Sequence, residues 1–199
     1  MGRPRTVSDT EILSAARAVF LESGPGASTQ LIADRIGLSQ AGLFKRFGTK
    51  QGLMVAALLP TMPPFVSEVR TGPNLEQPLH PQLQLIARDF VVFFRRMVPC
   101  LMVLKSSGID LEAVLKAFEE PPPLMARRLL TGYFQRAQEG GIAQLSDPAA
   151  VASLFLGAFH LHSFMSHITE EVMSDEALFA FSDAVVDMLW LGIAPKEAS

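Results

Sequence analysis

The chain has 199 residues, of which 49% are apolar and 19% charged, and its formal net charge is −3. This length allows one or two small domains, and the negative charge argues against indiscriminate binding of nucleic acid. The single cysteine excludes an internal disulfide, and the N-terminus lacks the apolar run of an export signal, so we expect a cytoplasmic protein.

The charge is divided unevenly along the chain. Residues 1–59 carry seven basic and four acidic side chains, which leaves +3 there against −6 in the remainder. A cationic N-terminal part on an acidic body is typical of a protein that meets polyanions with one end only.

Helix signals dominate, and no alternating strand pattern appears, so we predict an all-α fold. A first helix begins near Ser8, where Ser8 and Glu11 have the spacing of a capping box, and it ends at Gly24. A helix from about residue 49 to 59 follows the next segment and is stopped by Pro60.

Residues 28–50 indicate a helix-turn-helix. Ser28 caps a short helix, Gly37 permits a sharp turn, and Ser39 caps a second helix that reaches about Phe47. We therefore predict a three-helix DNA-binding domain, assigned to residues 1–50, and a helical domain over residues 51–199.

Prolines shape the middle of the chain. Six of them lie between residues 60 and 81, which excludes one uninterrupted helix and predicts a hinge between the domains. Residues 82–97 and 98–106 indicate one helix broken near Pro99, followed by helices over about 110–118 and 121–140.

The last two predicted helices, residues 147–169 and 175–192, are strongly apolar. Residues 148–169 contain no Asp, Glu, Lys or Arg, which predicts a helix buried on all sides. A membrane span is disfavoured because His160, His162 and His167 interrupt the run. We expect these two helices to form a four-helix homodimer interface. His160 and His167 lie about 10 Å apart along such a helix, which disfavours a shared metal ion.

The N-terminal pattern resembles the tetracycline-repressor (TetR) family of bacterial transcription regulators. The specific match covers roughly residues 6–55, whereas the remainder matches only in helical layout. The matching positions are Ile12, Leu13, Ala15, Ala16, Val19, Phe20, Gly24, Ser28, Ile32, Ala33, Gly37, Ser39, Leu43, Phe44, Phe47, Lys50 and Leu53.

The resemblance implies a homodimeric repressor that binds an inverted-repeat operator on double-stranded DNA and is released by a small molecule. It implies no cofactor and no metal. A ligand-independent DNA-binding or architectural protein is one alternative. A helical enzyme is another, although no phosphate loop, nucleophile elbow or metalloprotease motif occurs.

By analogy with the family, the helix that starts at Gln40 enters the major groove. Gln40 is the candidate for adenine recognition, Lys45 for a guanine or a phosphate, and Ala41 for a thymine methyl. Gln30 is a weaker candidate for base contact. The full DNA-binding set is Arg3, Arg5, Ser28, Thr29, Gln30, Ser39, Gln40, Ala41, Gly42, Phe44, Lys45, Arg46 and Lys50.

Two groups in this set have particular roles. Thr29, Arg46 and Lys50 are expected on phosphates, and Arg46 would replace the phosphate contact of a tyrosine that is here Phe44. Arg3 and Arg5 flank a proline and would either lie in the minor groove or carry incidental charge, alternatives of about equal weight.

The C-terminal domain is rich in aromatic residues and methionine, which favours an apolar or amphipathic effector. For any one of these residues, ordinary core packing is the more frequent role. The candidates for ligand binding are Phe90, Phe93, Phe94, Met97, Cys100, Met102, Phe118, Met125, Tyr133, Phe134, Phe155, Phe159 and His162.

Overall fold

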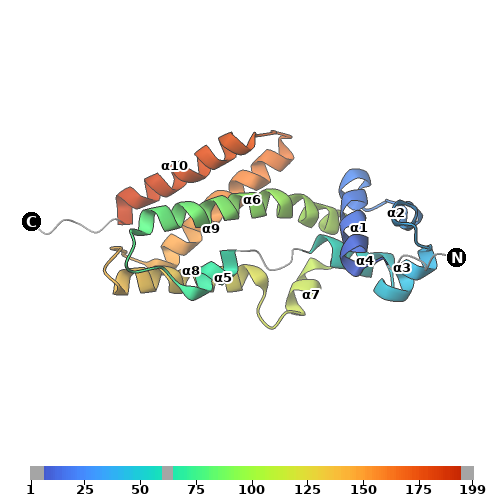
Figure 1. The fold of residues 1–199 in the computed structure, drawn as a ribbon, viewed down its shortest axis with the longest axis horizontal. Coiled ribbons are helices and arrows are strands. Elements are labelled where there is room, and N and C mark those ends of the chain that lie inside the picture. Colours follow the sequence, from blue (N-terminus) through green and yellow to red (C-terminus); the bar gives the residue numbers. More distant parts are fainter. Residues whose placement is uncertain (1–6, 60–64, 194–199) are drawn as a thin grey trace, which may run out of the picture. The chain divides into compact units, whose positions relative to one another are not determined.

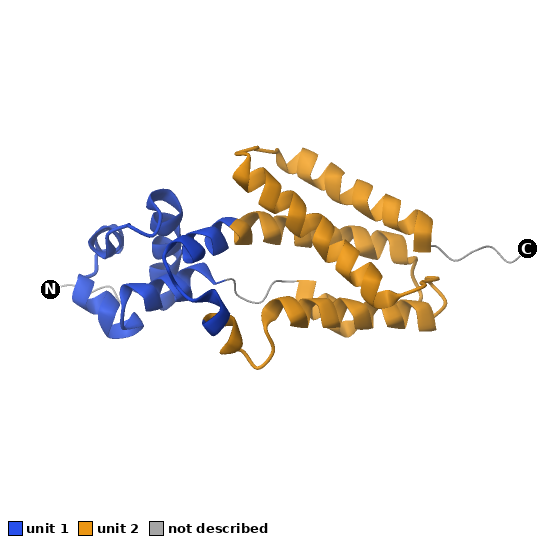
Figure 2. Ribbon diagram, turned by 180° about the vertical axis from the view of Figure 1, so that it is seen from behind, with its two compact units in different colours: residues 1–61, 99–113 blue, residues 62–98, 114–199 orange. Residues whose placement is uncertain are grey.

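The computed structural model describes residues 7–59 and 65–193, and every regular element in these ranges is an α-helix (Figure 1). The chain divides into two compact units (Figure 2). The first contains residues 7–59 and 99–113, and the second contains residues 65–98 and 114–193. The all-α prediction is confirmed, whereas the expected boundary at residue 50 differs from this division.

The first unit contains four short helices, each started by a residue with a capping side chain. They are α1 (Asp9–Ser23), α2 (Thr29–Ile36), α3 (Gln40–Phe47) and α4 (Lys50–Leu58). The capping box of Ser8 and Glu11 is formed as predicted, since the Glu11 amide donates to Ser8 Oγ at 3.2 Å and the Ser8 amide donates to the Glu11 carboxylate at 2.9 Å. Gly37 ends α2 with a φ of 68°, a left-handed conformation that favours glycine.

Apolar faces of these helices meet in one core. Phe20, Ile32, Leu43 and Leu53 are fully buried in it. Cys100 and Leu104 complete the core from α6, which is therefore shared between the units.

The remaining six helices lie wholly or partly in the second unit. They are α5 (Phe65–Thr71), α6 (Leu79–Ser106), α7 (Leu111–Lys116), α8 (Pro122–Glu139), α9 (Pro148–Ile168) and α10 (Asp175–Ile193). Helices α6 and α7 cross the division between the units, and the end of α6 belongs to the first. Within the second unit, α8 packs on α5 and α9, and α9 packs on α10.

Helix α6 differs from the prediction. It is one helix that continues through Pro99, so the expected break there is wrong. Proline removes one backbone hydrogen bond and disfavours the helical conformation before it. Val98 and Cys100 on either side are buried, and this packing offsets the loss. The helix also starts at Leu79 rather than 82, because Pro81 falls in the first turn, where proline is tolerated.

Two ion pairs and one contact between a histidine and a carboxylate connect α10 to α6 within the second unit. Arg88 Nη2 lies 2.6 Å from Asp183 Oδ2, and Arg95 Nη2 lies 2.7 Å from Asp175 Oδ1. His80 Nε2 lies 2.7 Å from Asp187 Oδ1. The pairs occur along the length of both helices and fix their antiparallel register.

Within one chain, helix α9 is buried on one side only; the expected burial on all sides includes a second subunit and stays a prediction. Leu154 and Leu161 remain 68% and 60% exposed, while Phe155 and Phe159 on another face are buried. Pro148–Ile168 is long and apolar enough to cross a membrane by length and composition alone, a property that core helices of other proteins share.

Candidate nucleic-acid interface and effector site

Two serines predicted to contact DNA begin the helices of the helix-turn-helix. Ser28 Oγ accepts from the Gln30 amide at 3.2 Å, and Ser39 Oγ accepts from the Gly42 amide at 3.1 Å. Each hydroxyl therefore satisfies an amide that the helix itself leaves unpaired. The serines set the start of α2 and α3 and thereby the direction in which α3 presents its side chains.

Gln40 and Thr29 form the link between the two helices. Gln40 Nε2 donates to Thr29 Oγ1 at 2.6 Å, and Thr29 is only 5% exposed. Because one end of the carboxamide is held by this bond, the orientation of Gln40 at the beginning of α3 is restricted. Thr29, expected on a phosphate, is thus placed as a buried partner of Gln40.

Several other predicted residues lie on the surface of the first unit. Gln30, Ala41 and Lys45 are exposed, and Lys50 is half-buried. Gln30 Nε2 donates to Asp34 Oδ1 at 2.7 Å, a pairing of neighbours one turn apart on α2. The predicted arm residues Arg3 and Arg5 lie outside the described residues.

Arg46 holds the start of α1 in the first unit. Its Nη1 donates to the carbonyl oxygen of Val7 at 2.7 Å and to Asp9 Oδ1 at 3.0 Å. The side chain is about one-third exposed. The predicted phosphate contact would compete with these bonds, and sequence reasoning missed them because Arg46 and Val7 are 39 positions apart.

Glycines 42 and 52 have different surroundings. A Cβ built on Gly42 would meet Ser39 Oγ at 3.4 Å, which is ordinary van der Waals contact. A Cβ on Gly52 would come far closer to the Phe47 carbonyl oxygen than real carbon atoms do. Gly52 therefore permits the tight turn between α3 and α4, and Gly42 is not required by packing. Phe44, the third departure from the family pattern, is half-buried.

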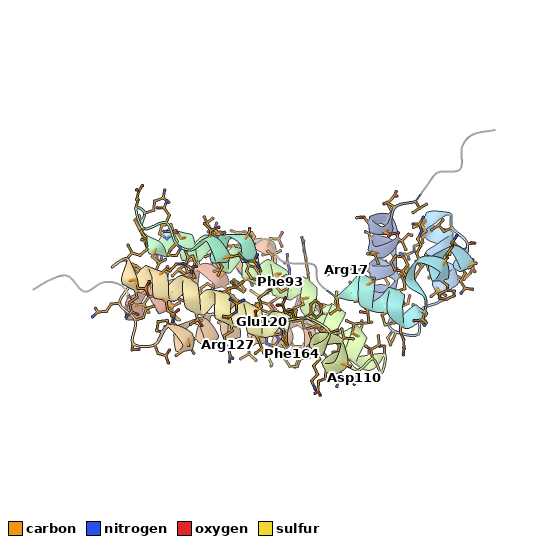
Figure 3. All side chains as sticks on the ribbon, turned by 90° about the horizontal axis from the view of Figure 1, so that it is seen from below. Arg17, Phe93, Asp110, Glu120, Arg127 and Phe164 are labelled. Atoms are coloured by element: carbon orange, nitrogen blue, oxygen red, sulfur yellow. The ribbon has the colours of Figure 1, made fainter. Side chains whose placement is uncertain are left out.

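Most predicted effector-binding residues meet in one aromatic cluster of the second unit. The Phe90 ring stacks on Phe94 at 5.9 Å and on Phe159 at 6.2 Å between centroids, and it meets Phe155 edge-on at 5.6 Å. Tyr133, Phe134, Phe93 and Met97 belong to the same core. Side chains from α6, α8 and α9 fill the space between these helices, with Phe93 and Phe164 marking α6 and α9 (Figure 3).

Burial changes the ionisation of Tyr133 in this core. Desolvation raises the pKa of its hydroxyl well above the usual range, and the nearby Glu68 carboxylate adds to the increase. The phenol is therefore neutral, and its oxygen lies 3.5 Å from Gln82 Oε1.

Four predicted residues lie apart from the aromatic cluster. Cys100 is buried in the core of the first unit, where burial raises the pKa of its thiol although Arg17 opposes the shift. Met102 and Phe118 are exposed and Met125 is half-buried. The remaining candidate, His162, does lie against the cluster, since it stacks on Phe181 with ring centroids 4.0 Å apart.

Sequence reasoning missed two aromatic members of this core. Phe65 stacks on Phe90 with centroids 3.9 Å apart, and Phe181 meets Phe159 edge-on at 6.2 Å. The spacing of Phe65, Val66 and Val69 is that of a helical face, but the surrounding prolines hid this short helix.

Two further features bear on binding chemistry. Among residues 7–59 and 65–193, no three His, Cys, Asp or Glu side chains are grouped so that they could hold a metal ion. An open depression is lined by Gln135, Gln138, Glu139 and Pro148, none of which belongs to the aromatic cluster.

Residues 12–57 match the family model of the bacterial regulatory proteins of the tetR family. The matched range contains the whole of the helix-turn-helix, α2 and α3. The match extends past residue 50 into α4, in agreement with the first structural unit.

Solved structures of TetR-family regulators share the fold of nearly the whole chain. A putative regulator from Mesorhizobium loti has a TM-score of 0.69 at 20% identity, with 94% of this chain and 96% of that chain covered. The flavonoid-responsive regulator FrrA has a TM-score of 0.59 at 21% identity, with 94% and 97% covered.

A third structure is the FadR regulator from Bacillus subtilis in complex with stearoyl-CoA. Its TM-score is 0.63 at 13% identity, with 92% of this chain and 97% of that chain covered. No curated protein matches the chain. The comparisons therefore show a tetR-family match over residues 12–57 and a fold of nearly the whole chain that is shared with solved TetR-family regulators.

Proposed function

We propose that this TetR-family protein is a homodimeric repressor that binds an inverted-repeat operator and releases it when an apolar or amphipathic small molecule binds. The observation that carries the proposal is the family match of a helix-turn-helix whose Gln40 is held in a fixed orientation.

Gln40 recognises a base through its carboxamide. One of the two Nε2 hydrogens is engaged by Thr29, which leaves the other hydrogen and Oε1 for N7 and N6 of an adenine in the major groove. Lys45 and Lys50 form no ion pair within the described residues and supply phosphate contacts. The bond to Thr29 restricts the orientation from which Gln40 can make this contact.

The test compares Gln40→Ala with Lys50→Ala on DNA selected from a random pool. Gln40→Ala should lower discrimination at one base pair of each half-site by about 1–3 kcal/mol. Lys50→Ala should weaken operator and random DNA alike and reduce the salt slope by about one phosphate. Lys105→Ala, an exposed lysine on α6, is the matched control and should leave both properties unchanged. Identical behaviour of the Gln40 and Lys50 variants would contradict the proposed roles.

The second subunit covers the exposed apolar faces of α9 and α10. Leu154, Leu161, Met165 and Ile168 recur at helical spacing on α9, and Met188 and Leu191 on α10 are 75% and 87% exposed. Two adjacent helices with such faces, related by two-fold symmetry, make a four-helix interface that is self-complementary.

Sedimentation of the purified protein tests this interface. Leu161→Glu and Leu191→Glu should shift the protein from dimer to monomer, because each buries a carboxylate in an apolar contact. Leu85→Glu, at an exposed leucine of α6, is the control and should remain dimeric. A wild-type monomer, or dissociation by the control alone, would contradict the proposed interface.

The effector occupies the aromatic cluster around Phe90 and Phe159. The fold is shared with a regulator solved with stearoyl-CoA, which is amphipathic and carries a long acyl chain, and with a regulator named for its response to flavonoids, which are aromatic. Helix α6 supplies Phe90 to the second core and Leu104 to the first, so a ligand that displaces α6 changes both. Such a ligand must prefer one conformation to shift DNA binding.

Native mass spectrometry of the purified protein tests whether it retains a small molecule. Measurement of operator binding with each retained compound then tests whether that compound is the effector. A compound that dissociates the operator complex supports a ligand-released repressor. Operator binding that no retained compound alters would favour the ligand-independent alternative.

A further inference from the structure

Ser163 has an unpaired hydroxyl in the middle of the apolar helix α9. The residue is 5% exposed, and its Oγ is buried without a hydrogen-bond partner among the described residues. Buried hydroxyl groups in native proteins almost always have a partner, because leaving one unpaired costs free energy of desolvation.

Other helical hydroxyls of the second unit do find partners in the preceding turn. Ser153 Oγ donates to the Ala149 carbonyl at 2.8 Å, and Ser182 Oγ donates to the Phe179 carbonyl at 2.8 Å. Ser182 is fully buried, so burial alone does not prevent this arrangement. The hydroxyl of Ser163 therefore differs from those of Ser153 and Ser182, which are hydrogen-bonded to backbone carbonyls.

The unpaired hydroxyl lies on the helix face that forms the aromatic cluster. Ser163 follows Phe159 by four residues and Phe155 by eight, which places the three on one face of α9. Phe159 and Phe155 both contact Phe90. The one other buried unpaired atom, among the described residues, is Arg136 Nε, whose guanidinium already donates through Nη2 to the Val69 carbonyl at the end of α5 at 3.0 Å.

The charged side chains near the aromatic cluster indicate whether its ligand is ionised or neutral. No Asp, Glu, Lys or Arg occurs in α9, and Arg88 and Arg95 of α6 are paired with Asp183 and Asp175. An ionised ligand group beside Ser163 would therefore find no permanently charged side chain on α9 to pair with and would be costly to bury. We propose that Ser163 binds the one hydrogen-bonding group, a hydroxyl or carbonyl, of an uncharged and otherwise apolar effector.

This inference rests on the proposed effector site, and the experiment separates the two. Equilibrium dialysis measures the affinity of the full-length protein for 2-naphthol, 2-methylnaphthalene and 2-naphthoate. We expect wild type to prefer 2-naphthol over 2-methylnaphthalene by about 2- to 10-fold, the effect of one hydrogen bond. Ser163→Ala should abolish this preference, and Ser182→Ala should retain it.

Each outcome decides one of the proposals. If neither neutral probe binds, the apolar effector site is contradicted, and the role of Ser163 with it. If the probes bind but the preference survives in Ser163→Ala, only the role of Ser163 is overturned. Tighter binding of 2-naphthoate than of 2-naphthol would overturn the uncharged class.

Thermal unfolding without ligand provides a second measurement. Ser163→Ala removes an unpaired hydroxyl, so its Tm should equal that of wild type or exceed it by about 2 °C. A decrease of several degrees would mean that the hydroxyl has a partner in the folded protein, which contradicts the proposal.

Discussion

Replacing Gly42 by alanine should stabilise the DNA-binding domain. Gly42 lies in α3, and its amide donates to Ser39 Oγ, a bond that alanine keeps. The added Cβ meets its nearest neighbour at 3.4 Å, so no atom has to move. Glycine within a helix costs about 0.5–1 kcal/mol relative to alanine, chiefly through the entropy of the unfolded chain. We expect a gain of that size in the free energy of unfolding.

Replacing Gly52 by alanine should instead lower the free energy of unfolding. Its new Cβ would collide with the carbonyl oxygen of Phe47, a backbone atom that cannot rotate away. Forcing an extra carbon into such a contact costs about 1–3 kcal/mol. Helix propensity alone predicts stabilisation at both positions, so the pair isolates the effect of packing.

Urea unfolding followed by far-ultraviolet circular dichroism measures both variants at one protein concentration, because dimerisation contributes to apparent stability. The two variants should differ from each other by about 2–4 kcal/mol. A destabilised Gly42→Ala, or a Gly52→Ala as stable as wild type, would refute the packing described here.

Three further substitutions test the helices and their charges. Arg46→Ala should destabilise the start of α1 by about 1 kcal/mol, because the bonds of this partly exposed side chain to Val7 and Asp9 are lost. Amide hydrogen exchange at the start of α1 measures the effect, and unchanged exchange would contradict this role. Pro99→Ala should raise the Tm, because it restores an amide donor to α6, and it should increase the free energy of unfolding by at most about 3 kcal/mol. A lower Tm would contradict a continuous helix. Partial desolvation and the nearby Asp89 raise the pKa of Glu68 in the folded protein. The folded state therefore binds more protons than the unfolded state at this group, and stability falls as the pH rises from the pKa of the unfolded state to that of the folded state. Glu68→Gln should therefore be more stable than wild type at pH 7, with an advantage that shrinks on acidification in a thermal-unfolding series.

Local chemistry made most helix boundaries predictable. Ser8, Ser28 and Ser39 cap helices where the sequence indicates, and Gly37 ends α2, because caps and turns depend on neighbours within a few residues. Pro99 was misjudged because the packing on both sides of it, which depends on residues far away in sequence, outweighs the local penalty.

The roles of the site residues were harder to predict than their location. The helix-turn-helix and most of the aromatic cluster follow from residue type and spacing. The bond between Gln40 and Thr29 spans 11 positions, and no pattern in the sequence specifies it. Cys100 looked like a pocket residue because its neighbours are apolar, yet α6 carries it into the core of the first unit.

The pairing of cations in the first unit bears on how this regulator achieves specificity. Arg35 is paired with Glu22 at 2.6 Å and Arg46 with Asp9 at 3.0 Å, whereas Lys45 and Lys50 form no ion pair within the described residues. A dimer would then offer these four lysines, together with whatever Arg3 and Arg5 contribute, for phosphate contact. Four to eight such contacts correspond to a salt slope of roughly −4 to −7. In the proposed complex these phosphate contacts carry no sequence information, so we expect discrimination between operators to depend on side chains such as Gln40 that are oriented before DNA binds.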